Sequence, residues 1–350
     1  MKIKAVRGFK DILPGETDLW QRTEAVAAGV LRNFGYKEIR VPVVERTELF
    51  ARSIGSDTDI VEKEMYSFPD RHGKSLTLRP EATAGVVRAV IEHSLAGDGR
   101  PLKLYSIGPM FRYERPQKGR QRQFHQLNVE AFNVNSPRMD AEMIAMLGHI
   151  LAELELDDVV MNINNLGCPV CRPGFKQKLQ DFLQEKRGEL CPDCQRRMDT
   201  NPLRVLDCKV PGCAEPVQDA PVILDSLCPP CRDHFDAVKK DLHGTNVAFT
   251  VNPRLVRGLD YYTRTTFEAQ TGELGSQNAV AGGGRYDGLV KTLGGPDIPA
   301  IGFAVGLERL VMLLEAQKRQ PPAGPDLFVA TLDEPSAEAA FGPVQELRRM

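Results

Sequence analysis

Two runs of alternating apolar and polar residues, separated by a short basic segment, constrain the fold of this chain more than any other feature. The first run covers residues 110–114 and the second covers residues 124–134. Pro116 and Gly119 lie between the runs, and both residue types interrupt strands. The pattern predicts two strands joined into a hairpin by a loop over residues 115–122.

The loop and its borders are basic. One acidic residue, Glu114, accompanies five cationic residues: Arg112, Arg115, Lys118, Arg120 and Arg122. A charged loop at a hairpin tip is often no more than a solvated turn. We expect Arg112 inside the first strand, however, where an unpaired guanidinium group is costly. Because its planar fork suits a phosphate or a carboxylate, we predict that the hairpin binds an anion.

Length and charge limit the remaining choices. With 350 residues, the chain is long enough for two or three domains and a well-buried core. Its formal net charge of −2 gives no global cationic field, so contact with nucleic acid would need a local basic patch. The N-terminus lacks the apolar core of a signal peptide, and no segment approaches the ~18 consecutive apolar residues of a membrane span. We expect a cytoplasmic protein without a membrane partner.

Hydrophobic periodicity and turn residues predict the elements around the hairpin. Helices are expected over residues 14–35, 138–154, 175–186 and 234–242, and strands over residues 34–45 and 159–165. A second hairpin is expected over residues 65–78, strand character over 246–269, a strand followed by a helix over 300–314, and a strand over 326–332 before a helix from Ser336. The glycine run at 282–284 fits neither Rossmann nor P-loop spacing, and read alone it predicts a flexible turn.

All eight cysteines lie between residues 168 and 231. In a cytoplasmic protein they should be reduced thiols or metal ligands. The CPVC and CPDC pairs are separated by 19 residues, within the spacing of structural zinc sites. This predicts structural Zn²⁺ at Cys168, Cys171, Cys191 and Cys194, with a second set available from Cys208, Cys213, Cys228 and Cys231. The opposite pairing of these motifs is equally open, and the alternative is eight thiols that merely pack.

Several strings resemble a known family. FRYERPQKGRQRQFHQLNVE (111–130) resembles motif 2 of class II aminoacyl-tRNA synthetases, in wording similar to that of histidyl-tRNA synthetases. FGYKEIRVPVVE (34–45) resembles motif 1, LVRGLDYY (255–262) a segment particular to the histidyl enzymes, and GLERL (306–310) motif 3. RPEAT (79–83) is similar to the family's Arg-Pro-Glu-Gly-Thr, with Ala82 in place of glycine. The likeness extends over nearly the whole chain.

The resemblance implies an α+β fold of class II type: a mixed, largely antiparallel sheet flanked by helices, with a helical insertion and the start of a C-terminal α/β domain. The expected catalytic core covers residues 1–166 and 244–317, and a cysteine-rich insertion domain covers residues 167–243. Residues 318–325 read as a linker, and residues 326–350 as the truncated start of an anticodon-binding domain.

The resemblance also implies roles for individual residues. Arg112 and Arg257 would hold the α-phosphate of ATP and Arg309 the γ-phosphate, which makes these three arginines the expected catalytic residues. Glu114 would lie beside the adenine amino group, completing an ATP-binding set of Arg112, Glu114 and Arg309. The expected histidine-binding residues are Glu81, Thr83, Arg112, Gln126, Glu130, Arg257, Tyr261 and Tyr262. Read without the resemblance, Glu81 and Thr83 are a dipole-compatible acid and a capping hydroxyl, and the tyrosines are strand aromatics.

The function implied is that of a histidine–tRNA ligase. The protein would use ATP and Mg²⁺ to activate L-histidine as histidyl-adenylate, then transfer it to the 3′ end of tRNA(His), as a homodimer. An alternative is a catalytically silent paralogue that serves as the histidine-sensing regulatory subunit of ATP phosphoribosyltransferase. The intact LVRGLDYY segment favours the ligase.

Overall fold

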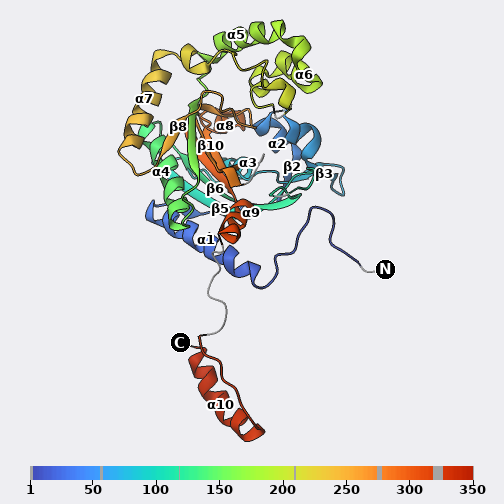
Figure 1. Ribbon diagram of the computed structural model, residues 1–350, viewed down its shortest axis with the longest axis vertical. Coiled ribbons are helices and arrows are strands. Elements are labelled where there is room, and N and C mark those ends of the chain that lie inside the picture. Colours follow the sequence, from blue (N-terminus) through green and yellow to red (C-terminus); the bar gives the residue numbers. More distant parts are fainter. Residues whose placement is uncertain are drawn as a thin grey trace.

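A large sheet organises the protein (Figure 1). The computed structural model describes residues 3–55, 58–117, 119–208, 210–273, 278–317 and 326–349. The sheet has eight strands in the order β1-β5-β6-β11-β10-β9-β7-β8. Its strands are β1 (Lys37–Glu38), β5 (Leu102–Phe111), β6 (Gln123–Phe132), β7 (Val160–Asn165), β8 (Phe249–Val251), β9 (Thr263–Gln270), β10 (Ala279–Arg285) and β11 (Ala300–Gly306). Only the β1–β5 and β7–β8 pairings among these strands are parallel, which confirms the mixed, largely antiparallel sheet.

Helices cover one face of this sheet and part of the other. The first face packs against α1 (Glu16–Asn33), α4 (Pro137–Glu153), α7 (Pro229–His243) and α9 (Leu307–Ala316). The second face packs against α3 (Thr83–Glu92) and α8 (Leu289–Thr292) at one end. Because side chains alternate along a strand, Leu127, Val129 and Ala131 of β6 enter the first core. The residues between them face the second side.

A smaller sheet of order β2-β4-β3 stands beside the large one. It consists of β2 (Val44–Arg46), β3 (Tyr66–Pro69) and β4 (Ser75–Leu78), next to α2 (Thr47–Ile54) and a π-helical turn, η1 (Ile60–Glu64). The hairpin expected over 65–78 is confirmed, and the Asp70 carboxylate closes its turn by accepting the backbone N–H groups of His72 and Lys74.

The single strand predicted over 34–45 is wrong. Its two ends form β1 and β2, which belong to different sheets. Pro42 lies between them and has no N–H group to continue a ladder. The backbone N–H of Ile39 still donates to Tyr105 of the large sheet, whereas the carbonyl of Val43 accepts from Arg79 beside the small one.

Residues 167–243 connect β7 to β8, which are parallel neighbours. The segment contains α5 (Arg172–Glu185), α6 (Pro192–Thr200), α7 and four short 3₁₀ turns, η2 (Arg187–Glu189), η3 (Pro202–Val205), η4 (Pro211–Cys213) and η5 (Ile223–Ser226). Its residues 171–231 pack around a core of their own that includes Phe175, Leu179 and Leu183, whereas α7 packs against the large sheet. In Figure 1 its helices α5 and α6 lie above the sheet.

The last described segment covers residues 326–349. It forms α10 (Glu334–Leu347), which begins with a capping box between Asp333 and Ser336 and confirms the helix expected there. The strand predicted over 326–332 is wrong, because no strand among the described residues pairs with this segment. The predicted linker, 318–325, lies outside the described residues. Across the described chain, every helix is too short or too polar to cross a membrane.

Candidate active site

The central hairpin is confirmed, but Arg112 does not lie in a strand. β5 begins earlier than predicted and ends at Phe111, so Arg112 is the first residue of the loop. Its backbone N–H donates to the carbonyl of Arg122 at 2.9 Å, its Nε donates to the carbonyl of Pro80 at 2.9 Å, and its guanidinium lies 5.2 Å from the Phe124 ring centre. These contacts point the side chain into a cavity instead of burying it in the sheet. Lys118 lies outside the described residues.

The cavity has a volume of about 230 Å³ and lies over the second face of the large sheet. Its floor alternates polar and small positions, because Gln126, Asn128 and Glu130 on β6 pair with Gly306, Ala304 and Gly302 on β11. The cavity therefore has room because these β11 positions carry either no side chain or only a methyl group. The predicted site residues that line it are Glu81, Thr83, Arg112, Glu114, Gln126, Arg257, Tyr261, Tyr262 and Arg309.

Glu130 is the one predicted site residue that lies just beneath this lining. Its carboxylate accepts hydrogen bonds from the hydroxyl of Thr83, at 2.7 Å, and from the hydroxyl of Tyr286, and both of these side chains line the cavity. Burial raises the pKa of Glu130 to about 8, although the two hydrogen bonds work in the opposite direction. The group can therefore exchange a proton near neutral pH.

Glu81 closes the N-terminus of α3. Its carboxylate accepts the backbone N–H of Thr83 at 2.7 Å and that of Ala84 at 3.0 Å. Burial raises the pKa of Glu81, and these backbone bonds oppose the rise. The sequence read without the resemblance made the Thr83 hydroxyl the cap. In the structure the carboxylate of Glu81 caps the helix, and the Thr83 hydroxyl donates to Glu130. Both residues still line the cavity.

Arg257 lies over β10, where it pairs with an acidic residue and occupies the space above a glycine. It pairs with Glu268 of β9, and its guanidinium lies 5.9 Å from the ring centre of Tyr262. Burial works to lower the pKa of Arg257, but Glu268 and the neighbouring tyrosines outweigh it and raise the pKa. A Cβ at Gly282 would lie 2.4–2.6 Å from the guanidinium atoms, so any larger residue there must displace the guanidinium.

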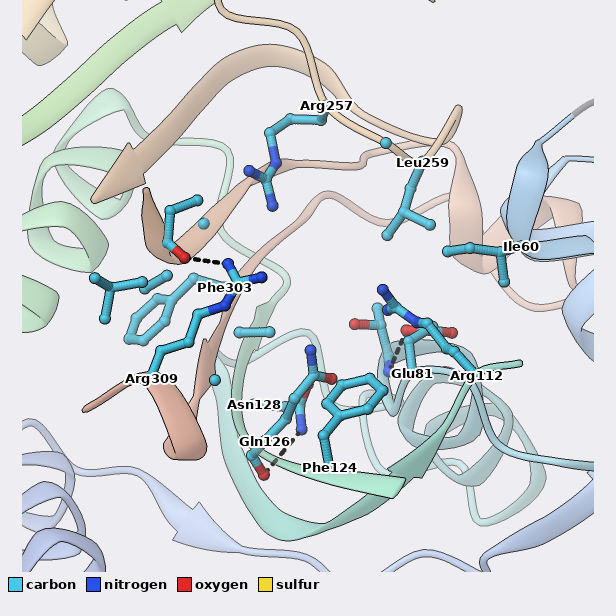
Figure 2. A pocket seen from close by; sticks show the side chains of 18 of the residues that line it. Ile60, Glu81, Arg112, Phe124, Gln126, Asn128, Arg257, Leu259, Phe303 and Arg309 are labelled. Atoms are coloured by element: carbon cyan, nitrogen blue, oxygen red, sulfur yellow. Dashed lines mark hydrogen bonds between the residues drawn. The ribbon is translucent and has the colours of Figure 1, made fainter. Parts of the chain in front are cut away.

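Arg309 reaches the cavity from the first turn of α9. Its Nε donates to the carbonyl of Gly119 at 3.2 Å, and its Nη1 donates to the carbonyl of Ala279. Burial lowers the pKa of Arg309, and the nearby Arg120 adds to this effect. Figure 2 shows Arg112, Arg257 and Arg309 directed into the cavity from three sides, and they come from three separate parts of the chain.

Apart from Oε2 of Glu114, which is ion-paired with Arg120, two buried polar atoms at this site have no partner among the described residues: Nε of Arg257 and Oε1 of Gln126. Buried polar groups are nearly always hydrogen-bonded, and leaving one unpaired costs about 1–3 kcal/mol. Both residues line the cavity. A polar molecule that fills the cavity can therefore supply an acceptor for Nε of Arg257 and a donor for Oε1 of Gln126.

The aromatic residues lie in a loop before β9, not in a strand. Tyr261 and Tyr262 have ring centres 4.7 Å apart, and the Tyr261 ring lies 5.6 Å from that of Tyr286. The three rings form the apolar end of the cavity, next to Glu130. The glycine run at 282–284 is likewise not a turn, since it lies inside β10, where Gly283 passes against the carbonyl of Gly302.

Sequence reasoning missed several residues. Tyr286 and Glu268 hold Glu130 and Arg257, yet neither was selected. Glu268 gave a signal, because it is the one acidic residue within β9. Tyr286 follows the glycine run and gave none. A fully buried Asp140, bonded to Arg285 and His234, was also missed, because its partners are 145 and 94 residues away.

The predicted zinc set is wrong in its grouping. The structure places Cys168 and Cys171 with Cys228 and Cys231, not with the CPDC pair. The remaining four cysteines form a second cluster: Cys191, Cys194, Cys208 and Cys213. The spacing along the chain misled because the start of α7 returns to the start of α5, which brings the first and last pairs together.

Comparison with known proteins agrees with the resemblance. Residues 8–310 match the family described as histidyl-tRNA synthetase. A curated relative from Desulfatibacillum aliphaticivorans, named histidine–tRNA ligase, is 60% identical over 340 residues, covering 97% of this chain and 81% of its own length. A relative of the same name from Syntrophotalea carbinolica is 55% identical over 350 residues, covering 100% of this chain and 83% of its own length.

Solved structures lead to the same family. The apo crystal structure of S. aureus histidyl-tRNA synthetase matches with a TM-score of 0.80 at 37% identity, covering 99% of this chain and 83% of that one. A Bacillus halodurans C protein described as an ATP phosphoribosyltransferase regulatory subunit/histidyl-tRNA synthetase matches with a TM-score of 0.67 at 21% identity, covering 90% and 84%, and this likeness shows the fold alone. With relatives this similar and a family match over residues 8–310, the chain belongs to the histidyl-tRNA synthetase family, on a class II fold.

Proposed function

We propose that this protein activates L-histidine with ATP and transfers it to the 3′ end of tRNA(His). In the first step a carboxylate oxygen of histidine attacks the α-phosphorus of ATP, and pyrophosphate leaves. In the second a hydroxyl at the 3′ end of the tRNA attacks the activated carbonyl, and AMP leaves. The observation that carries this proposal is the convergence of three arginines on one cavity, where Nε of Arg257 and Oε1 of Gln126 have no partner among the described residues.

Charge develops on the phosphoryl oxygens in the first step, so fixed cations supply much of the catalysis. Arg112 and Arg257 act at the α-phosphate, and Arg309 acts at the γ-phosphate. Arg257 suits this role because Glu268 and Gly282 fix its guanidinium before the substrate enters. Such preorganisation also holds the carboxylate and the phosphorus in attack geometry.

Histidine is read at the opposite end of the cavity. Glu130 and Tyr262 act at the two nitrogens of the imidazole ring, while Glu81, Thr83 and Gln126 act at the α-amino group, with Tyr261 packing beside them. A carboxyl group whose pKa is about 8 can either donate to or accept from an imidazole near neutral pH. Glu114, which also lines the cavity, acts at the adenine amino group.

Mg²⁺ would enter on the phosphates of ATP, since this ion usually keeps substrate oxygens and waters with only one or two carboxylates. Glu308 is a carboxylate of the lining that would meet this need. The ion would neutralise charge on the phosphates, and the arginines position them. We place a structural Zn²⁺ role in residues 167–243, away from these arginines.

The remaining parts of the proposal concern organisation. We propose the domain limits given above, supported for residues 171–231 by a hydrophobic core of their own, whereas α7 packs against the large sheet. The protein would act in the cytoplasm as a homodimer. The loop at 115–122 would contact tRNA phosphates, which should make tRNA binding weaken steeply with salt.

Histidine-dependent exchange of pyrophosphate into ATP tests this function. We expect exchange that requires histidine and ATP and is absent with other amino acids. Tight histidine binding without any exchange would instead favour the silent regulatory paralogue. Charging of tRNA(His) by the same preparation then tests the second step.

A further inference from the structure

The two cysteine clusters have the geometry of closed metal sites. Within each cluster the four sulfur atoms all lie within 4.8 Å of one another. The sulfur–sulfur separations include 3.6 Å for Cys168–Cys171, 3.7 Å for Cys168–Cys228, 3.8 Å for Cys171–Cys231 and 3.9 Å for Cys191–Cys208. Four sulfurs at about 2.3 Å from a tetrahedral zinc lie about 3.8 Å apart, whereas a disulfide would need about 2.05 Å.

The backbone around both clusters is arranged to support thiolates. The N–H of Cys168 donates to Sγ of Cys171 at 3.1 Å, and the N–H of Val170 donates to Sγ of Cys168 at 3.4 Å. In the other cluster, Sγ of Cys213 accepts from the N–H of Cys191 at 3.2 Å. Donors of this kind stabilise negative sulfur and fix ligand orientation, and four neutral thiols that merely pack do not need them.

We propose that residues 167–243 hold two structural Zn²⁺ ions, each bound by four cysteine thiolates. One ion is bound by Cys168, Cys171, Cys228 and Cys231, and the other by Cys191, Cys194, Cys208 and Cys213. Four protein ligands leave no open position, so both sites are structural and take no substrate. The first site ties the start of α5 to the start of α7, and the second is nested inside the loop that the first one closes.

The nested arrangement fixes the loop that carries Arg257. From the segment, Arg204 donates to the carbonyl of Arg257 at 3.1 Å, and the amide of Asn201 donates to Asp260 at 2.8 Å. In return, Arg254 donates to the carbonyls of Gln218 and Ala220, both at 2.7 Å. We therefore expect loss of zinc to loosen residues 252–262. Only the effect of this loosening on activity rests on the proposed function.

Metal analysis of serine variants tests both the metal and the grouping. Protein purified without chelator should contain about two zinc ions per chain. The double variant Cys168→Ser/Cys228→Ser should retain about one ion, because both changes fall on one site. The matched double variant Cys168→Ser/Cys191→Ser should retain almost none, because it damages both sites. Grouping by sequence neighbours would give the reverse result and overturn the assignment.

The parent protein provides a test that does not depend on whether the variants fold. X-ray absorption at the zinc edge should show four sulfur neighbours at about 2.3 Å. Titration with a thiol reagent should release about two zinc ions as eight thiols react. Fewer than ~0.2 zinc ions per chain with freely titratable thiols, a single ion per chain, or iron in place of zinc would each overturn the proposal.

The consequence for the Arg257 loop has its own measurement. After chelation, hydrogen exchange at residues 252–262 should accelerate, while exchange in β5 and β6 should not change. Unchanged exchange at 252–262 in zinc-free protein would remove the coupling. These readouts need no catalysis, so they remain informative even if pyrophosphate exchange fails and the proposed function falls.

Discussion

Gly302 on β11 lies directly opposite Glu130 on β6, and the carboxyl group of Glu130 occupies the space that a side chain at position 302 would fill. A Cβ there would lie 1.8 Å from Oε2 of Glu130 and 2.6 Å from the carbonyl oxygen of Val129. Atoms cannot approach so closely, so any larger residue must displace the carboxyl group or part the strands. Strand pairing and site chemistry therefore meet at this position.

Replacing Gly302 with alanine should damage the site more than the fold. We expect Gly302→Ala to lower kcat/KM for histidine in pyrophosphate exchange by about 10²-fold, because displacement of a site group by about 1 Å can cost that much. Gly288→Ala is the matched control, since a Cβ there meets nothing within 4 Å. Equal activity in the two variants would contradict the role given to Glu130.

Removing the guanidinium of Arg257 should slow adenylate formation. We expect Arg257→Ala to reduce pyrophosphate exchange by roughly 10²-fold or more, the effect of losing one preorganised donor, with a smaller change in histidine affinity by calorimetry. Because this variant leaves Glu268 without its partner, Arg257→Ala/Glu268→Gln separates the lost cation from the unpaired acid. Near-parental exchange in both would remove Arg257 from the mechanism.

Gly282→Ala tests the same guanidinium without deleting it. The added Cβ would lie 2.4 Å from Nη1 of Arg257, so the group must move. Exchange should fall in the same direction as in Arg257→Ala. Gly272→Ala serves as the control, because its Cβ would meet nothing within 4 Å. Full activity of Gly282→Ala would show that the exact position of Arg257 does not matter.

Glu130 should make the protein less stable as pH rises. Its pKa is raised from 4.5 to about 8 by burial, so the folded state holds its proton more tightly than the unfolded chain. The stability it contributes is full below pH 4.5 and is lost as pH rises through about 8. Glu130→Gln should remove up to about 1.4 kcal/mol per pH unit from that slope in urea unfolding. The exposed Glu185→Gln should keep the parental slope, and an unchanged slope in Glu130→Gln would contradict the assignment.

Asp140 should act with the opposite sign. Burial favours its neutral form, but the hydrogen bond from His234 and the charge of Arg285 outweigh this and lower the pKa of Asp140. Its contribution is present above the unfolded pKa and is lost as pH falls through the folded one. We expect Asp140→Asn to destabilise the protein by up to about 3 kcal/mol at pH 7 and by less under acid conditions, because the buried Arg285 then keeps only Asp287 as an acidic partner. Asp297→Asn, at an exposed pair, should change stability by less than about 1 kcal/mol.

Local pattern predicted most of the elements, and the errors arose where a partner lies far along the chain. The helix at 14–35 and the hairpin at 65–78 depend on neighbouring residues, and both are confirmed. The strand at 34–45 divides because its two ends meet different sheets. The cysteines group by the return of α7 to α5, which no spacing encodes. The segment 326–332 has strand composition but no described partner.

The site residues could be predicted for a different reason from the helices and strands. The three arginines and the tyrosine pair were selected because they lie in motifs of a known family, not because periodicity places them together. Their meeting in one cavity is a property of strand order. Tyr286 and Glu268 lie outside the quoted motif residues, and their importance becomes visible only when β9 and β10 are seen beside Glu130 and Arg257.

The parallel pairing of β7 with β8 has a consequence for how this protein could be re-engineered. Parallel neighbours cannot be joined by a tight turn, so some crossover of a dozen or more residues is obligatory at this point. The sheet sets where that crossover leaves and returns and needs α7 against its first face, so only the residues between β7 and α7 are open to redesign. A shorter crossover without α5 and α6 should therefore be graftable here, provided that it keeps α7 and still supplies one donor to the carbonyl of Arg257 and acceptors for Arg254.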